Sequence, residues 1–310
     1  IPYSYTDSNW KDKLTAYNGQ AITYDAIGNP LNDGTWTYNW EAGRRLAGLQ
    51  TENESISYSY EYGRRLMSRS YYNITTLSSD SVSYDWREEQ LVHVTDGTNE
   101  MHFYYDAQNR PAMADFNGTY YTYLHNLQGD VVGLVDSSNN IVVEYKYDAW
   151  GRPTLKRSLT TAYDALATLN PFRYRGYIYD EASGLYYLRS RFYNPVWGRF
   201  VSIDALEALW YSISTLSNKN LFAYCDNNSI ARMDCAGEFW ETIFDVISFG
   251  ASVVEVALNP RDPLAWAALV GDTIDLLPFV SGIGELTRAV KTTVKTVEAG
   301  ENIIQTARKL

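Results

Sequence analysis

Cysteine and histidine are scarce in this chain, with 2 Cys and 3 His among 310 residues. Two cysteines cannot build a disulfide scaffold. The three histidines, His93, His102 and His125, are scattered, without the spacing of zinc ligands and without the companions of a catalytic triad. We therefore expect no metal and no cofactor, and we assign these histidines to strand surfaces and turns.

Basic residues are also in deficit, because 26 Lys and Arg stand against 37 Asp and Glu, for a net charge of −11. This balance argues against a nucleic-acid partner held by a broad basic surface. No stretch of about 18 residues is both apolar throughout and free of charge, so we expect no ordinary membrane span. The opening residues, Ile1–Tyr5, lack the basic and apolar regions of a signal peptide, and we expect none in this sequence.

Tyrosine is abundant by contrast, with 27 residues, of which the first is Tyr3 and the last is Tyr224. The part that holds them is also rich in Thr, Ser, Asn and Gly, which is the composition of β-strands joined by turns. The part after about Gly237 is rich in Ala, Val, Ile and Leu at helical spacing. The predicted fold class is therefore mainly β, followed by an α-helical C-terminal segment.

The tyrosine-rich part contains a repeat, in which an aromatic residue precedes an acid and a glycine or asparagine follows shortly after. At a hairpin turn the acid accepts backbone hydrogen bonds, and glycine or asparagine supplies a positive φ. An arginine that opens the return strand lies within reach of the acid. Repeats of this kind predict an extended sheet. The aromatic–acid pairs are Tyr24-Asp25, Trp40-Glu41, Tyr60-Glu61, Tyr105-Asp106, Tyr147-Asp148 and Tyr179-Asp180.

A more specific pattern lies between Asn170 and Gly237. It resembles the core signature of the Rhs/YD-repeat proteins, a family that includes wall-associated toxins of Gram-positive bacteria. The looser repeats upstream extend the resemblance over most of the chain. The segments that carry the core signature are Pro171–Pro195, Trp197–Asp204, Asn220–Asn228 and Met233–Gly237.

The resemblance implies three parts: YD-repeat β-hairpins over residues 1–169, a repeat-associated core that plugs the shell over 170–237, and a helical pre-toxin linker over 238–310. In this family the repeats form a spiral β-sheet that closes into a hollow shell around a C-terminal toxin. We therefore expect the chain to package and deliver a toxin that lies outside it. The expected partners are this cargo and, through it, a cognate immunity protein, and the expected location is secreted or cell-surface.

By the same resemblance, we expect the chain to be a fragment of a longer protein. Its open sheet would then expose an edge, which favours association with other chains. A competing interpretation from another functional class is a cell-surface adhesion or carbohydrate-binding module built on the same repeats.

Family members that cut themselves use two aspartates, which correspond here to Asp204 and Asp234. Two close carboxylates cannot both ionise easily, so one keeps its proton, and the pair can activate a water and protonate the leaving amine. The expected cut lies after Glu238, with Arg199 and Gly237 in supporting positions. At most, this predicts a single turnover of self-cleavage as an aspartyl protease.

Three departures from the family pattern favour a structural role for the two aspartates instead. Cys235 replaces a proline, Glu238 replaces a leucine, and 206–216 has the character of an insertion. In the structural interpretation, Asp234 holds a turn and Asp204 caps a short helix. Both interpretations stay open at the level of sequence.

The same resemblance implies that Arg199 and a cluster of four further arginines form ion pairs within the core, and we expect stacking on Tyr174, Tyr186 and Tyr187. The alternative places these arginines on solvated strand faces. The cluster consists of Arg173, Arg175, Arg189 and Arg191. A disulfide between Cys225 and Cys235 is one alternative for the two cysteines, and simple packing of two thiols is the other.

For residues 238–310, apolar positions recur at helical spacing, which predicts three helices. We favour a packed helical bridge between shell and toxin. The alternative is a membrane-inserting segment, for which acidic residues among the apolar positions make spanning costly at neutral pH.

Overall fold

The computed structural model divides the chain into two compact units, one made of Ile1–Ile230 with Asp234–Trp240 and the other of Ala231–Met233 with Glu241–Leu310. From the second unit the structure describes the antiparallel pair β22 (Arg232–Met233) and β23 (Glu241–Thr242). The helices predicted for 238–310 lie outside the described residues and stay a prediction. The structure describes residues 1–61, 65–203, 220–229, 232–234 and 241–242.

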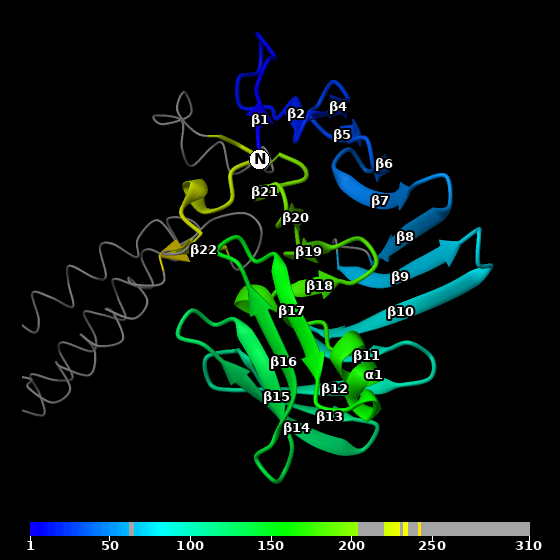
Figure 1. Ribbon diagram of the computed structural model, residues 1–310, viewed down its shortest axis with the longest axis vertical. Helices are drawn as coiled ribbons and strands as arrows, with labels where there is room; N and C mark the ends of the chain where they lie inside the picture. Colours follow the sequence, from blue (N-terminus) through cyan, green and yellow to red (C-terminus); the bar gives the residue numbers. More distant parts are fainter. Residues whose placement is uncertain (62–64, 204–219, 230–231, 235–240, 243–310) are drawn as a thin grey trace, which may run out of the picture. The chain divides into compact units, whose positions relative to one another are not determined.

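A large antiparallel sheet dominates the described part of the first unit, and each of its strands pairs with the next strand in sequence (Figure 1, blue to green). Short turns therefore make almost every connection, which is what the repeated turn signals predict. Strands β4 and β17 form the two edges of this sheet. Its fourteen described strands are β4 (Thr23–Tyr24), β5 (Pro30–Asn32), β6 (Thr37–Glu41), β7 (Arg45–Gln50), β8 (Glu54–Tyr60), β9 (Leu66–Asn73), β10 (Ser78–Arg87), β11 (Gln90–Thr95), β12 (Glu100–Tyr105), β13 (Pro111–Phe116), β14 (Thr119–His125), β15 (Val131–Val135), β16 (Ile141–Tyr147) and β17 (Pro153–Ser158).

The aromatic–acid repeats form hairpin turns, as predicted. At the turn between β12 and β13, Asp106 Oδ1 accepts hydrogen bonds from the backbone N–H groups of Gln108 and Arg110, at 2.9 Å each. Asn109 has a φ of 61°, the left-handed conformation that the motif requires. The Arg110 guanidinium returns to Asp106 Oδ2 at 2.9 Å. This repeat thus closes its own turn with local bonds.

In five of the six aromatic–acid repeats, the aromatic side chain donates a hydrogen bond to a backbone carbonyl of the preceding part of the chain, which the sequence did not indicate. The Tyr105 hydroxyl donates to the Leu91 carbonyl at 2.7 Å, and the Tyr60 hydroxyl donates to the Leu46 carbonyl at 2.6 Å. The pairing of β11 with β12 covers His93–Thr95, so Leu91 lies beyond the paired stretch. The tyrosine tip therefore supplies a hydrogen bond that the ladder between these two strands lacks. Equivalent bonds come from Tyr24, Trp40, Trp86, His125 and Tyr147.

Smaller elements complete the described part of the first unit. One three-stranded sheet near the N-terminus consists of β1 (Tyr3–Ser4), β2 (Ala16–Tyr17) and β3 (Gln20–Ala21). A four-stranded sheet consists of β18 (Ile178–Asp180), β19 (Leu185–Tyr187), β20 (Phe192–Asn194) and β21 (Arg199–Phe200). The described helices are short: α1 (Asp164–Leu169) and the 3-10 turns η1 (Thr161–Tyr163), η2 (Tyr174–Gly176) and η4 (Cys225–Asn227).

We call the described residues 170–203, 220–229 and Asp234 the core segment. It packs on the buried face of the large sheet, where β18–β21 lie beside the curved strands in Figure 1. The Phe103 and Phe172 rings lie 4.9 Å apart, and so do the Tyr58 and Phe192 rings. Aromatic side chains of this size carry much of the apolar area that the fold removes from water.

The observed architecture confirms the mainly β fold class. The part of the chain that the structure describes holds no helix long and apolar enough to cross a membrane.

Candidate functional site

The core segment is anchored to the large sheet by a buried acid. Asp180 Oδ2 accepts a hydrogen bond from the Tyr58 hydroxyl at 2.6 Å, and Asp180 Oδ1 lies 3.3 Å from the Arg69 Nε. The side chains of Asp180 and Arg69 are only 4% and 7% exposed. Burial, reinforced by the Asp180 charge, raises the pKa of Tyr58 well above its ordinary value, so this hydroxyl remains a donor. Asp180 belongs to the sixth aromatic–acid repeat, and its role as an anchor was not apparent from the sequence.

Arg173 is fully buried and bonds mainly to backbone carbonyls at the start of the core segment. Its guanidinium donates to the carbonyls of Asn170 and Ala167, and it forms an ion pair with Glu181 at 3.1 Å. The guanidinium carbon also lies 4.0 Å from the Tyr145 ring centroid in β16. Arginine presents five donors in a fixed plane, which suits a site of convergent carbonyls and an aromatic face.

Ion pairs of the other arginines in the cluster are present, but two of the acidic partners lie in turns of the large sheet and not within the core as predicted. Arg175 lies 3.7 Å from Asp130, and Arg189 lies 3.3 Å from Glu89, so both connect the core segment to the turns of the large sheet. The predicted stacking on Tyr174 is present, because the Arg175 guanidinium lies 5.0 Å from that ring centroid.

Asp234, a member of the predicted aspartate pair, is 2% exposed. Its carboxylate Oδ2 lies 3.7 Å from the Arg191 guanidinium, and its backbone N–H donates to the Tyr177 hydroxyl at 2.9 Å. The Tyr177 hydroxyl in turn lies 2.9 Å from the Tyr224 hydroxyl. Burial raises the pKa of Tyr224 well above its ordinary value. The Asp234 carboxylate is therefore buried near a guanidinium, and its backbone N–H is bonded to one of two paired phenols.

The other members of the predicted site are only partly described. Asp204, Gly237 and Glu238 lie outside the described residues, so the aspartate pair and its cut site stay a prediction. Arg199 is half-buried over the Tyr5 ring, with 5.2 Å between guanidinium carbon and ring centroid. Among the described atoms, its Nε and Nη1 are buried without a hydrogen-bond partner.

The cysteine alternatives also remain open. Cys225 is buried in the core segment, and Cys235 lies outside the described residues. The predicted disulfide therefore stays a prediction.

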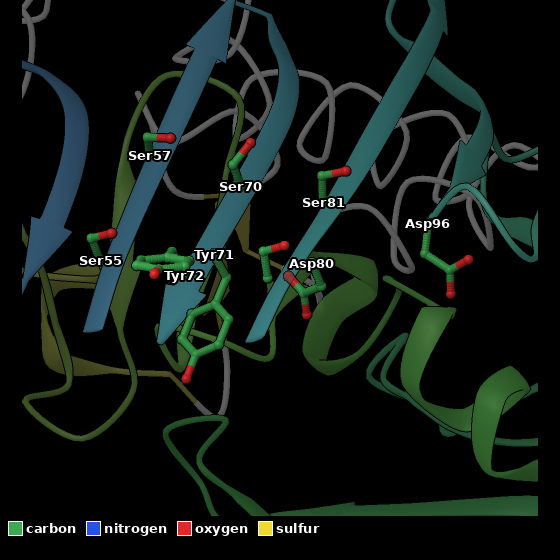
Figure 2. A pocket seen from close by; sticks show the side chains of 9 residues that line it. Ser55, Ser57, Ser70, Tyr71, Tyr72, Asp80, Ser81 and Asp96 are labelled. Atoms are coloured by element: carbon green, nitrogen blue, oxygen red, sulfur yellow. The ribbon is translucent and has the colours of Figure 1, made fainter. Parts of the chain in front are cut away.

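A polar pocket of about 430 Å³ lies across β8, β9 and β10 (Figure 2). Ser57, Ser70 and Ser81 occupy one row of this sheet, because the register pairs Ser70 with both of the others. Ser55 and the exposed Tyr72 form the next row. Hydroxyls beside an aromatic ring offer the chemistry that sugars bind.

Two histidines that the sequence left without companions come together in the sheet. His93 in β11 is the direct cross-strand partner of His102 in β12, and Glu100 lies beside them. Sequence spacing did not reveal this cluster because a hairpin, rather than a motif, creates it.

Comparison with known proteins agrees with this architecture. Residues 5–230 match the family model of the teneurin YD-shell. The chain is 33% identical over 237 residues to the tRNA3(Ser)-specific nuclease WapA of Bacillus spizizenii and 32% identical over 237 residues to the tRNA nuclease WapA of Bacillus subtilis. Each match covers 74% of this chain and 10% of the relative, so the chain spans about a tenth of the length of these relatives.

Solved structures share the fold at low sequence identity. A crystal structure of TcdB2-TccC3-TEV matches with a TM-score of 0.55 and 20% identity, over 69% of this chain and 11% of that chain. A Photorhabdus luminescens Tc holotoxin pore matches with a TM-score of 0.55 and 19% identity, over 69% of this chain and 10% of that chain. The match to the family model covers most of the chain, and the repeats, turns and core segment agree with it. The chain therefore belongs to the teneurin YD-shell family.

Proposed function

We propose that this chain is the closing part of a YD-repeat shell that packages and delivers a toxin encoded after it. The observation that carries the proposal is the buried contact of Asp180 with Arg69 and Tyr58, which fastens the core segment onto the sheet. A curved sheet with the core segment fixed to its inner face can enclose a folded cargo and keep it from solvent.

The named relatives suggest the kind of cargo. Two of them are named as tRNA nucleases, and such an activity has to be kept from the producing cell's own tRNA. We infer a toxic C-terminal cargo, an immunity protein that binds this cargo, and a location outside the cell or on its surface.

Limited proteolysis of the natural chain that contains this segment tests the packaging. We expect the domain after Leu310 to resist protease in the intact protein and to become sensitive in an Asp180→Ala variant. An Asp80→Ala variant is the control, because Asp80 also pairs with Arg69 but is largely exposed. Digestion at the rate of the isolated cargo domain in the unmodified protein would contradict packaging.

For release of the cargo, we propose self-cleavage by Asp204 and Asp234. Asp234 lies 3.7 Å from the Arg191 guanidinium, and we assign to it the role of accepting a proton from the attacking water. Asp204 would then carry the proton that the leaving amine needs. The balanced reaction is hydrolysis of one peptide bond after Glu238, which yields a new carboxyl group and a new amine.

This step is tested by measuring the intact mass of three purified 1–310 chains: the unmodified chain, Asp204→Asn and Asp234→Asn. Cleavage near Glu238 in the unmodified chain alone supports the pair. A full-length mass for all three chains, repeated in the longer natural protein, would assign the two aspartates a structural role.

A second candidate function, carbohydrate binding, rests on the polar pocket of Figure 2. A glycan array probed with the unmodified chain and with Tyr72→Ala tests it, because Tyr72 supplies an exposed aromatic face beside the serine rows. Binding that the substitution removes supports the adhesion role. The absence of binding to any glycan would eliminate it.

For the linker, we propose a packed bridge at 238–310, and membrane contact is the alternative. Leakage from anionic liposomes, with the whole chain at about pH 5 and about pH 7, separates the two because protonated acids lower the cost of insertion. We expect no leakage at either pH, and leakage at the lower pH would favour membrane contact.

A further inference from the structure

Four charged or titratable residues form a row across β10, β11, β12 and β13. The register pairs Asp85 with His93, His93 with His102, and His102 with Asp115. Their neighbours along the strands point to the opposite face, because side chains alternate in a β-strand. Those neighbours are core residues: Tyr84, Val94, Met101 and Ala114. The row therefore lies on the face of the sheet that is turned away from the core segment.

The two imidazoles and a carboxylate converge within this row. The His93 and His102 rings are nearly parallel, with centroids 4.5 Å apart and an interplanar angle of 26°. Glu100, two residues before His102 on the same face, places its Oε2 3.9 Å from the His93 Nε2. One ligand atom each from His93, Glu100 and His102 lies within 4.8 Å of the others.

Asp85 sets the orientation of the first imidazole. The His93 Nδ1 lies 2.8 Å from the Asp85 Oδ2. An ionised carboxylate can only accept a hydrogen bond, so the Nδ1 carries the proton and the Nε2 lone pair points to Glu100 and His102. The Nε2 is buried and has no hydrogen-bond partner among the described residues. A histidine held in this way by a carboxylate is the usual arrangement of a metal-binding imidazole.

We propose that His93, Glu100 and His102 bind a divalent transition-metal ion of the zinc class, with Asp85 as a positioning residue. Two imidazoles and one carboxylate are a common zinc ligand set. A tetrahedral ion would bring the ligand atoms to about 3.3 Å from one another, which requires a small rotation of the exposed Glu100 and His102 side chains. The ion would connect β11 and β12 on the outer face.

Asp115 extends the same arrangement to the second imidazole. It lies opposite His102 across β12 and β13, and its Oδ1 is buried without a hydrogen-bond partner among the described residues. When one ring nitrogen of His102 binds a metal, the other ring nitrogen carries a proton. This N–H can then donate to the Asp115 carboxylate, which is the cross-strand neighbour of His102. The site thus has an orienting acid beside each histidine.

Titration of the chelator-treated 1–310 chain with Zn²⁺ by calorimetry, and with Co²⁺ by visible absorption, tests the proposal. We expect one ion per chain and tetrahedral Co²⁺ absorption bands. His102→Ala should weaken Zn²⁺ binding by at least about tenfold, and His93→Gln combined with His102→Ala should abolish it. Asp85→Asn should weaken binding by about tenfold, since it keeps the size of the side chain but loses the charge.

The third histidine is the matched control. His125 bonds to the Pro111 carbonyl at 2.7 Å and lies outside the row, so His125→Gln should leave Zn²⁺ affinity within about twofold of the unmodified chain. Circular dichroism of each variant checks that it is folded. A rise in melting temperature with Zn²⁺ should occur in the unmodified chain and disappear in His102→Ala. Absence of stoichiometric binding, or equal affinity in His102→Ala, would overturn the proposal.

Discussion

Exposed and buried residues alternate along β12 of the large sheet, whereas every residue of β19 and β20 in the core segment is buried. The large sheet has one face toward the core and one toward solvent, so backbone ladders and local turns hold it together. The core segment has strands of two or three residues, and much of its support comes from side chains that bond to distant backbone or acidic groups. Arg175, Asp180 and Tyr186 are examples.

This difference decides how each region should respond to substitution. A turn of the large sheet is closed by bonds within five residues, so its loss should affect one hairpin. A bond of the core segment joins residues that are far apart in sequence, such as Tyr58 and Asp180. We therefore expect buried polar groups of the core segment to give the largest losses of stability.

We expect Asp180→Ala to cause the largest loss in the free energy of unfolding. The substitution leaves Arg69 buried without its inner carboxylate and Tyr58 without its acceptor. Loss of one partner of a buried ion pair costs about 3–5 kcal/mol. Urea unfolding measures the change, with Asp80→Ala as the control, expected to cost about 1 kcal/mol or less because its side chain is 57% exposed. Equal losses in the two variants would contradict the distinction between the two regions.

Gly151→Ala should rank second. Gly151 has a φ of 82°, and an added Cβ would lie 2.5 Å from the Tyr174 ring of the core segment. Strain at a positive φ costs about 1 kcal/mol, and the ring contact adds about 1–3 kcal/mol of overpacking. Gly43→Ala provides the comparison, since its φ is 85° and an added Cβ meets no atom within 4 Å. Thermal unfolding should show the larger loss for Gly151→Ala, and similar losses would count against a close core contact.

Tyr60→Phe should have a smaller effect. It removes the hydroxyl that donates to the Leu46 carbonyl at 2.6 Å and keeps the ring. One such hydrogen bond contributes about 1 kcal/mol. Tyr72→Phe, at an exposed position, should change the unfolding free energy by a few tenths of a kcal/mol at most. If the two variants have the same free energy of unfolding, the bond from Tyr60 to the Leu46 carbonyl contributes nothing to stability.

The smallest expected effect is the contribution of Asp106 to the pH dependence of stability. Burial opposes ionisation of Asp106, but hydrogen bonds from the Arg110 backbone and side chain prevail and lower its pKa below the ordinary value of 3.8. A lowered folded-state pKa gives stability that is present above 3.8 and is lost as pH falls through the folded value. Asp106→Asn keeps the turn acceptor, as Asn126 does naturally, but cannot titrate. The stability difference between the two chains should shrink on acidification, and a constant difference would contradict this role.

The sequence predicted the hairpins because their determinants are local: an aromatic–acid pair, a residue with positive φ and an alternating strand. Asp106 with Asn109 shows this directly. The bond from Tyr105 to the Leu91 carbonyl was not predicted. It depends on where the pairing of β11 with β12 ends, and composition alone does not fix strand register.

The candidate site was predicted less completely. Ion pairs of the arginine cluster were expected from the family resemblance, but the position of Arg173 over Tyr145 depends on how the core segment meets β16. The cluster of His93 with His102 depends on a register between two strands. Such pairings between strands require the folded sheet, since nothing in the spacing of the two histidines distinguishes a shared face from opposite faces.

We expect the core segment and the large sheet to unfold as one cooperative unit. Hydrogen exchange by mass spectrometry on the 1–310 chain measures this directly, by comparing the amides of β18–β20 with those of β8–β15. We predict the same protection for both groups in the unmodified chain, and joint loss of protection in Asp180→Ala. Rapid exchange of β18–β20 in the unmodified chain, with β8–β15 still protected, would contradict the account.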